Sequence, residues 1–254
     1  MTPRRHPLEA LSLDPGLADG VPGWEQHAHS RFSDGKAEAA AVAEQAWKLG
    51  LSRLIFTEHT EPHLVSGPGW FGDYAREVRR LAAEYAGRME ILLGLEVPAL
   101  DFQGGVELDE AMAAEADFVL GAVHALPGQG WLGGRSPEQA IELEHKALLG
   151  LLDNPRIDAL AHPGGITHLY VTPFPMSLFD EVVRRAAERG VAIEMNPAYQ
   201  DPLEPYLACC RRHGARISPG SNAHHLEGLG WAWRELSRLA VRGSSHVGEE
   251  GVVA

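Results

Sequence analysis

The chain has 254 residues, and 22 Lys and Arg against 35 Asp and Glu give it a formal net charge of −13. This acidic balance argues against nucleic-acid backbones and anionic membranes as non-specific partners, although bound cations can still attract an anionic substrate. Hydrophobic residues make up 44% of the chain, which is enough to bury a sizeable core. The length suits one α/β barrel or two small domains.

The cysteines and the apolar segments indicate where the protein works. The two cysteines, Cys209 and Cys210, are adjacent, so no disulfide framework is expected and a reducing cytoplasm is the simpler location. The N-terminal residues lack the apolar run of a signal peptide. No stretch approaches the roughly 18 apolar residues of a membrane helix. We therefore expect a cytoplasmic protein without a membrane partner.

Strand-like and helix-like segments alternate along the chain. We expect a loose lead-in at 1–22, a single domain at 23–241 and a flexible tail at 242–254. The expected strands are 24–28, 51–57, 89–97, 117–124, 156–161, 191–196 and 215–221. The expected helices are 36–49, 73–85, 108–116, 136–152, 177–188, 203–212 and 227–239.

Each expected strand is followed by a helix, a pattern that predicts a parallel sheet covered by helices. An open sheet and a closed barrel both satisfy this pattern. A barrel is favoured because no Gly-rich phosphate-binding fingerprint follows the first strand. In addition, polar side chains follow nearly every strand instead of gathering at one switch point, as they do in barrel enzymes.

The 13 histidines are an excess over average usage, and their positions indicate a metal centre. Ligand-type side chains follow six of the seven expected strands: His27, His29, His59, Glu96, His124, His162, Asn222 and His224. The two-residue spacing of His27 and His29 places both imidazoles on the same side of a strand, which is a chelating arrangement. Imidazole and carboxylate ligands without a thiolate favour Zn, Mn or Fe. Glu96 has two oxygens and could bridge two ions.

The other histidines and the cysteines are given no such role. Three histidines stand near expected site loops and stay open: His63, His168 and His225. Four are interpreted as ordinary polar residues: His6, His145, His213 and His246. The cysteines fall in an expected helix and are interpreted as ordinary packed or surface residues.

Seven sequence blocks resemble, in order and spacing, those of the PHP phosphoesterases, and most of all the histidinol-phosphatase type. The blocks are HAHSRFSDG, TEHTEPH, GLEV, DFVLGAVH, AHPG, AIEMN and PGSNAHH. The resemblance extends over roughly residues 24–230 and makes 23–241 a PHP domain. It implies a distorted seven-stranded (βα)7 TIM-like barrel, in agreement with the strand count. It also implies two or three divalent ions (Zn, Mn or Fe) at the C-terminal face.

Three ion positions follow from the resemblance, residue by residue. The first would use His27, His29, Glu96 and Asn222. The second would use His59 and His224, with Asp34 as a further ligand. The third would use Glu96, His124 and His162. The residues implied in catalysis are His27, His29, Glu96, Asn222 and His224. Glu58 beside His59 either orients an imidazole or is an ordinary surface residue.

The sequence departs from the family pattern at two points. Asn222 stands where the family usually has Asp, and a neutral amide oxygen binds a cation more weakly and cannot accept a proton as a carboxylate does. The Arg that the histidinol-phosphatase type usually places after the EIN-like strand to hold phosphate is missing from the corresponding segment. Arg31 and Arg135, on the expected loops after the first and fourth strands, are the substitute candidates for substrate binding, with an ordinary exposed arginine as the alternative for each. His225 is a further candidate.

Three functional hypotheses follow. The first is hydrolysis of a small phosphate monoester by a metal-activated water that attacks phosphorus in line. The second is a catalytically impaired or non-catalytic metal-binding PHP module, which Asn222 favours. The third is another metal hydrolase of the same fold, such as a phosphodiesterase or nuclease, which the acidic charge and the lack of a basic stripe disfavour. The oligomeric state is not readable from the sequence.

Overall fold

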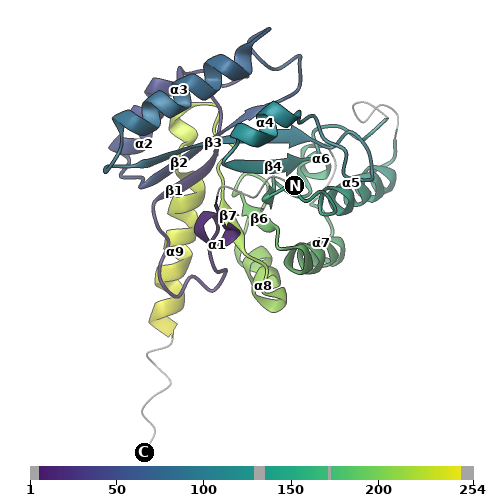
Figure 1. The fold of residues 1–254 in the computed structure, drawn as a ribbon. Coiled ribbons are helices and arrows are strands. Elements are labelled where there is room, and N and C mark those ends of the chain that lie inside the picture. Colours follow the sequence, from purple (N-terminus) through teal and green to yellow (C-terminus); the bar gives the residue numbers. More distant parts are fainter. Residues whose placement is uncertain (1–5, 129–134, 171–172, 247–254) are drawn as a thin grey trace, which may run out of the picture.

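The computed structural model describes residues 6–128, 135–170 and 173–246, and its strands form a single parallel sheet in chain order. The strands are β1 (Trp24–Ala28), β2 (Arg53–His59), β3 (Glu90–Pro98), β4 (Phe118–Ala122), β5 (Ala159–Leu160), β6 (Ala192–Met195) and β7 (Ile217–Pro219). The helices are α1 (Leu8–Leu11), α2 (Ala39–Lys48), α3 (Trp70–Glu84), α4 (Glu110–Glu115), α5 (Pro137–Leu151), α6 (Gly165–Tyr170), α7 (Met176–Arg189), α8 (Glu204–His213) and α9 (Trp231–His246), with a short 3-10 turn at Leu226–Gly228. Figure 1 shows the helices around the sheet.

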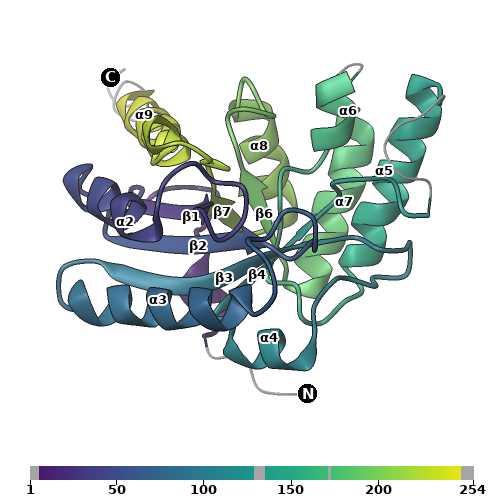
Figure 2. The same cartoon turned by 90° about the horizontal axis from the view of Figure 1, so that it is seen from above.

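The sheet curls into a nearly closed barrel, as expected from the sequence (Figure 2). An isolated parallel bridge joins Ala28, at the end of β1, to Ala223, just after β7. The His29 amide donates to the Ala223 carbonyl at 3.0 Å, and the Ala223 amide donates to the His27 carbonyl at 3.1 Å. The seam between the first and last strands is therefore held at the same end of the barrel as the histidines.

Local sequence signals account for the helix ends. Ser136 and Gln139 form a reciprocal capping box at the start of α5. Gly190 and Gly214 end α7 and α8 in the left-handed conformation that glycine adopts without a steric penalty. β5 is much shorter than expected, because regular pairing covers only two residues there before the chain turns into α6, a short helix that the sequence pattern did not indicate.

The N-terminal segment differs from the expectation of a loose lead-in. Leu8 and Leu11, on α1, are buried in one apolar cluster with Ile55, Leu92, Phe118, Leu120 and four alanines that lie in the strands or directly after one. Leu13 adds an antiparallel bridge to Ile217 at the start of β7. One turn of helix with two leucines is too short to give a periodic signal. The segment closes the end of the barrel opposite the histidines.

The C-terminal helix is longer than expected. α9 continues to His246, so part of the tail expected from residue 242 is helical, and 247–254 lie outside the described residues. Within the described ranges, no helix combines the length and the apolar character needed to cross a membrane.

Candidate metal centre

The side chains expected as ligands converge at the C-terminal ends of the strands. His27 and His29 come from β1 and the residue after it, His59 ends β2, and Glu96 lies on β3. The pairing of β1 with β2 shifts register between Glu25 and Ala28, a bulge of the kind that re-aims side chains beside functional sites. The Nε2 atoms of His27 and His29 lie 3.1 Å apart, so the two-residue spacing does bring both imidazoles together.

Glu96 stands at the middle of the cluster and is fully buried. Its Oε2 faces one group of imidazole nitrogens, at 3.2 Å from His27, 3.5 Å from His29 and 3.2 Å from His59. Its Oε1 faces a second group, at 3.0 Å from His124 and 3.0 Å from His162. Each oxygen therefore belongs to a different set of donors.

A further group surrounds Asp34, which lies on the loop between β1 and α2. Asp34 Oδ1 lies 3.0 Å from His224 Nε2 and 3.5 Å from His59 Nε2. The ring of His29 stacks on those of His59 and His224 at centroid distances of 4.4 and 4.2 Å. The structure thus brings together four donors that the chain spreads over the β1, β2 and β7 ends.

Asn222 lies in the centre and has strained backbone geometry. Its Oδ1 is 3.1 Å from His29 Nε2, and its Nδ2 donates to the Tyr199 hydroxyl at 3.4 Å. Asn222 has a φ of 50° and His162 a φ of 25°, in the region that disfavours side chains with a Cβ. Such strain is maintained only where surrounding contacts fix it, and it clusters at functional sites.

Sequence reasoning missed two carboxylates that contact the candidate ligands. Glu194, on β6, is fully buried, and its Oε1 accepts a hydrogen bond from His27 Nδ1 at 2.6 Å, while its Oε2 accepts the backbone N–H of His162. Glu61, just after β2, lies 2.5 Å from His124 Nδ1 and 3.7 Å from His59 Nδ1. For Glu194 the available signal was a glutamate inside an otherwise apolar strand, because such residues are almost never buried without a partner.

Glu58 accepts hydrogen bonds from the loop after β1 and does not orient an imidazole. Its carboxylate accepts hydrogen bonds from the amide and hydroxyl of Ser30, at 2.9 and 2.5 Å, and from the Ser33 hydroxyl at 2.5 Å. Side chains alternate along a strand, so Glu58 points away from the side that His59 occupies. Its effect is to fix the loop that carries Asp34.

The proposed substrate-binding residues lie at the edge of the centre or beyond it. Arg31 is exposed and donates to Glu38 and to the Lys36 carbonyl, so the structure does not bring it to the cluster. His225 is exposed just before the 3-10 turn, and Arg135 lies two residues before α5. Tyr199, which sequence reasoning missed, lies closer, with its ring 4.9 Å from that of His162.

The three undecided histidines are exposed: His63, His168 and His225. Among them, His168 has its ring 5.7 Å from that of Tyr199. It therefore stands at the rim of the centre and not among the buried donors.

Electrostatics prepare the centre for a cation. Burial opposes ionisation of Glu96, but His27, His124 and His59 hold the pKa of its carboxyl well below its usual value. Burial and the neighbouring His59 lower the pKa of His29 well below its usual value, so this ring stays neutral, as a ligand must. Burial also disfavours the charged form of His124, yet Glu96 and Glu61 raise its pKa to about 10, so this ring carries a proton that a bound ion would displace.

The donor set fits divalent metal ions. Neutral imidazoles and carboxylates are the ligand types of Zn, Mn and Fe. Several buried polar atoms in this cluster have no hydrogen-bond partner among the described residues: His29 Nδ1, Asp34 Oδ1, His59 Nδ1, Glu61 Oε2 and Glu96 Oε2. Buried polar atoms are normally paired, and coordination to a cation would satisfy donors that face one another in this way.

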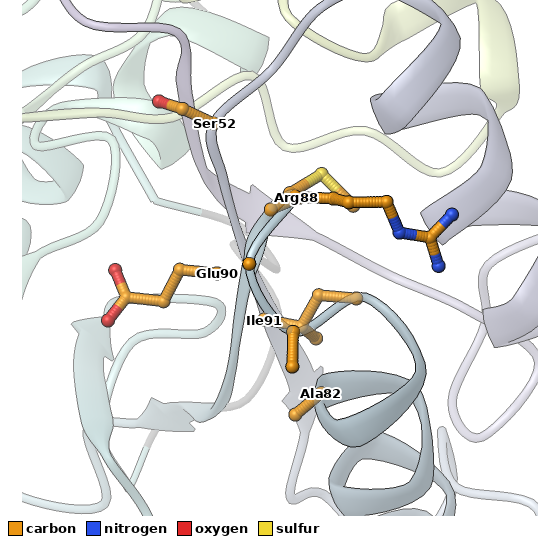
Figure 3. A pocket seen from close by; sticks show the side chains of 8 residues that line it. Ser52, Ala82, Arg88, Glu90 and Ile91 are labelled. Atoms are coloured by element: carbon orange, nitrogen blue, oxygen red, sulfur yellow. The ribbon is translucent and has the colours of Figure 1, made fainter.

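A surface pocket at the other end of β3 lacks this chemistry. Figure 3 shows Ser52, Ala82, Arg88, Glu90 and Ile91 around it, and its lining includes no histidine. Glu90 Oε2 there pairs with Arg53 at 2.6 Å, and the Arg88 guanidinium lies over the ring of Tyr85 at 4.7 Å. The charged side chains of this pocket, Arg88 and Glu90, therefore already have partners within the protein.

The fold is a parallel α/β barrel, and buried histidines and carboxylates gather at its C-terminal end. These two features place the protein among the barrel proteins that carry a metal centre. The family model of the PHP domain matches residues 25–198. The chain therefore belongs to the PHP domain family.

Curated relatives include two named as probable phosphatases. The one from Acetivibrio thermocellus is 27% identical over 211 residues, covering 79% of this chain and 78% of that protein. The one from Clostridium novyi is 27% identical over 195 residues, covering 72% and 70%. The DNA polymerase/3'-5' exonuclease PolX of Bacillus subtilis is 28% identical over 209 residues, covering 80% of this chain but 34% of that protein.

Two solved structures share the fold. The histidinol phosphate phosphatase of Lactococcus lactis, in complex with zinc, L-histidinol and phosphate, has a TM-score of 0.66 at 21% identity and covers 86% of this chain and 93% of that chain. A candidate histidinol phosphatase from Listeria monocytogenes has a TM-score of 0.68 at 14% identity, with coverages of 83% and 98%.

Proposed function

We propose that this protein is a metal-dependent phosphatase that hydrolyses small phosphate monoesters. The observation that carries the proposal is the position of Glu96, whose two oxygens face separate sets of imidazoles in a buried centre. A carboxylate so placed can join two neighbouring ions, and paired ions suit the in-line displacement of phosphoester hydrolysis. The family and the relatives named as probable phosphatases support the same function.

The residues divide into three ligand sets in the proposed centre. The first is His27, His29, Glu96 and Asn222, the second is Asp34, His59 and His224, and the third is Glu96, His124 and His162. The two or three ions would be Zn, Mn or Fe. When bound, they would lower the pKa of the attacking water and polarise the phosphoryl oxygens.

The protein's own groups orient this arrangement. Glu194 holds the proton on His27 Nδ1, which leaves Nε2 to face Glu96. Glu61 acts in the same way on His124 Nδ1. Glu58 fixes the loop that carries Asp34, and the ring of Tyr199 covers one side of His162.

The substrate class follows from charge. A chain with a net charge of −13 has little attraction for a polyanion outside the metal centre. A small dianionic monoester can reach the ions themselves, whereas a nucleic acid needs an extended basic surface. L-histidinol phosphate is the first substrate to test, because the Lactococcus lactis neighbour holds L-histidinol and phosphate.

A phosphodiesterase or nuclease activity is the second candidate, and the match to PolX is the observation that favours it. A non-catalytic metal-binding module is the third candidate, and Asn222 favours it.

One assay separates the three candidates. The protein is reconstituted with Mn²⁺ or Zn²⁺ and assayed with p-nitrophenyl phosphate, L-histidinol phosphate, bis(p-nitrophenyl) phosphate and single-stranded DNA, with Glu96→Gln as the matched control. We expect metal-dependent release of phosphate from monoesters that Glu96→Gln abolishes. Hydrolysis of diesters alone would replace the phosphatase proposal by the second candidate, and metal binding without turnover would replace it by the third.

A further inference from the structure

We propose a second metal site, selective for zinc-like ions, on the outer wall of the barrel between α7 and α8, formed by Asp180, Cys209 and His213. The two helices lie side by side in both views (Figures 1 and 2). The site shares no residue with the histidine centre. A bound ion would link α7 directly to α8.

The backbone places the three donors together. Cys209 and His213 are four residues apart on α8, so they lie on one face of the helix, one turn apart. Asp180 comes from α7. The three ligand atoms all lie within 4.8 Å of one another.

Two of the three separations between ligand atoms are close to those of tetrahedral coordination. Asp180 Oδ1 lies 3.5 Å from Cys209 Sγ and 3.1 Å from His213 Nε2. Zinc bonds of about 2.0–2.3 Å at tetrahedral angles separate neighbouring ligand atoms by about 3.3–3.6 Å. An ion would draw the Cys209 and His213 ligand atoms, which lie within 4.8 Å of each other, to a similar separation, and water can supply the fourth ligand.

Burial points to the same atoms. Cys209 is fully buried, and His213 Nε2 is a buried atom without a hydrogen-bond partner among the described residues. The Asp180 side chain is 37% exposed and gives an ion access from solvent. A carboxylate and a thiolate balance a divalent charge, and the thiol proton passes to solvent as the sulfur–metal bond forms.

Arg212 is the one described group that opposes an ion here. Its Nη2 donates to Asp180 Oδ1 at 2.5 Å, but its side chain is 59% exposed. The guanidinium can therefore turn into water or move to the other carboxylate oxygen at little cost, since exposed ion pairs contribute little stability.

The thiolate distinguishes this site from the histidine centre. Cys209 and Cys210 are the only cysteines in the chain, so a sulfur ligand can come only from α8. Co²⁺ bound by a thiolate gives an intense near-ultraviolet charge-transfer band, whereas Co²⁺ bound by imidazole and carboxylate gives none. Titration of the full chain with Co²⁺, followed by Zn²⁺ to displace it, therefore reports this site whether or not the protein is a phosphatase.

We expect one thiolate-bound Co²⁺ per chain. Cys209→Ala should abolish the band, while Cys210→Ala, the matched control on the same helix, should keep it. His213→Gln should weaken Co²⁺ binding at this site by more than about tenfold, because loss of a ligand costs more than loss of an outer partner. Far-ultraviolet circular dichroism checks the fold of each variant.

Either of two outcomes overturns the proposal: saturation with Co²⁺ without a charge-transfer band, or a band that survives Cys209→Ala. If Cys209→Ala does not fold, Asp180→Asn and His213→Gln decide the matter, since neither side chain is fully buried. Unchanged Co²⁺ affinity in both of these variants also overturns the site.

Discussion

Glu194 Oε1 lies 2.6 Å from His27 Nδ1, and both side chains are fully buried. The second oxygen of the same carboxylate accepts the backbone N–H of His162. One side chain from β6 therefore fixes residues at the ends of β1 and β5. Outer carboxylates of this kind hold a histidine in the tautomer and orientation that a metal requires.

Glu194→Gln should weaken metal binding while the protein still folds. The amide cannot hold the His27 proton as a carboxylate does, and loss of such a partner costs about 10–100-fold in metal affinity. The measurement is Mn²⁺ affinity by competition with a chelator. Glu188→Gln, an exposed position on α7, is the control and should bind like the wild type. Equal affinity in both variants would show that Glu194 does not position the ligand.

Asn222→Asp should bind metal more tightly and turn over faster. The added carboxylate faces His29, where the amide oxygen now lies at 3.1 Å, and one more anionic ligand raises cation affinity by about tenfold or more. Elemental analysis and phosphatase rate are the measurements. Gln103→Glu adds the same charge at an exposed site and should change neither. Were Asn222→Asp to match the wild type in both, residue 222 would not be a ligand.

Much of the architecture could be predicted from the sequence, because short local patterns are enough to recognise alternating strands and helices. The convergence of His27, His29 and His59 was also predictable, since parallel strands end at one face. Glu61 and Glu194 could not be placed in this way, because their importance depends on which imidazole stands opposite. The packing of Leu11 depends on contacts with distant strands that no short pattern reports.

Chelation should lower the thermal stability of the loaded protein. An ion that binds only the folded state at a free concentration of about 100 times its Kd stabilises by about 2.7 kcal/mol, which corresponds to roughly 5–10 °C in Tm for a chain of this size. Mn²⁺ is the ion to use, because it favours oxygen and imidazole over thiolate. A scan with and without chelator measures the effect, and Glu96→Gln should lose most of it. An equal shift in Glu96→Gln would place the stabilising ion elsewhere.

Leu11→Ala should destabilise the fold although it lies outside the strands. Leu11 is 1% exposed and packs inside the barrel, and such truncations cost about 2–5 kcal/mol. Denaturant unfolding measures the loss, with Leu100→Ala, at 50% exposure, as a control that should stay near zero. A change below about 0.5 kcal/mol would mean that α1 does not contribute to the core.

Glu144 should make stability depend on pH. Burial raises the pKa of its carboxyl above 4.5, although Thr167 and Ile166 donate hydrogen bonds to it. The folded state therefore holds this proton more tightly, and its stabilising effect is lost as pH rises from 4.5 through the raised value. The advantage of the wild type over Glu144→Gln in free energy of unfolding should shrink from pH 4.5 towards neutrality. Glu142→Gln, exposed on the same helix, should show no such loss, because Lys146 lowers the pKa of the Glu142 carboxyl.

The seam between β1 and β7 determines when the candidate metal centre can form during synthesis of the chain. His29 and Asn222 face each other although 193 residues separate them in the chain. A growing chain on the ribosome presents β1 long before the partner donors after β7 exist. An ion that needs donors from both segments could therefore bind only after β7 has been synthesised, and it would fasten the first strand to the last.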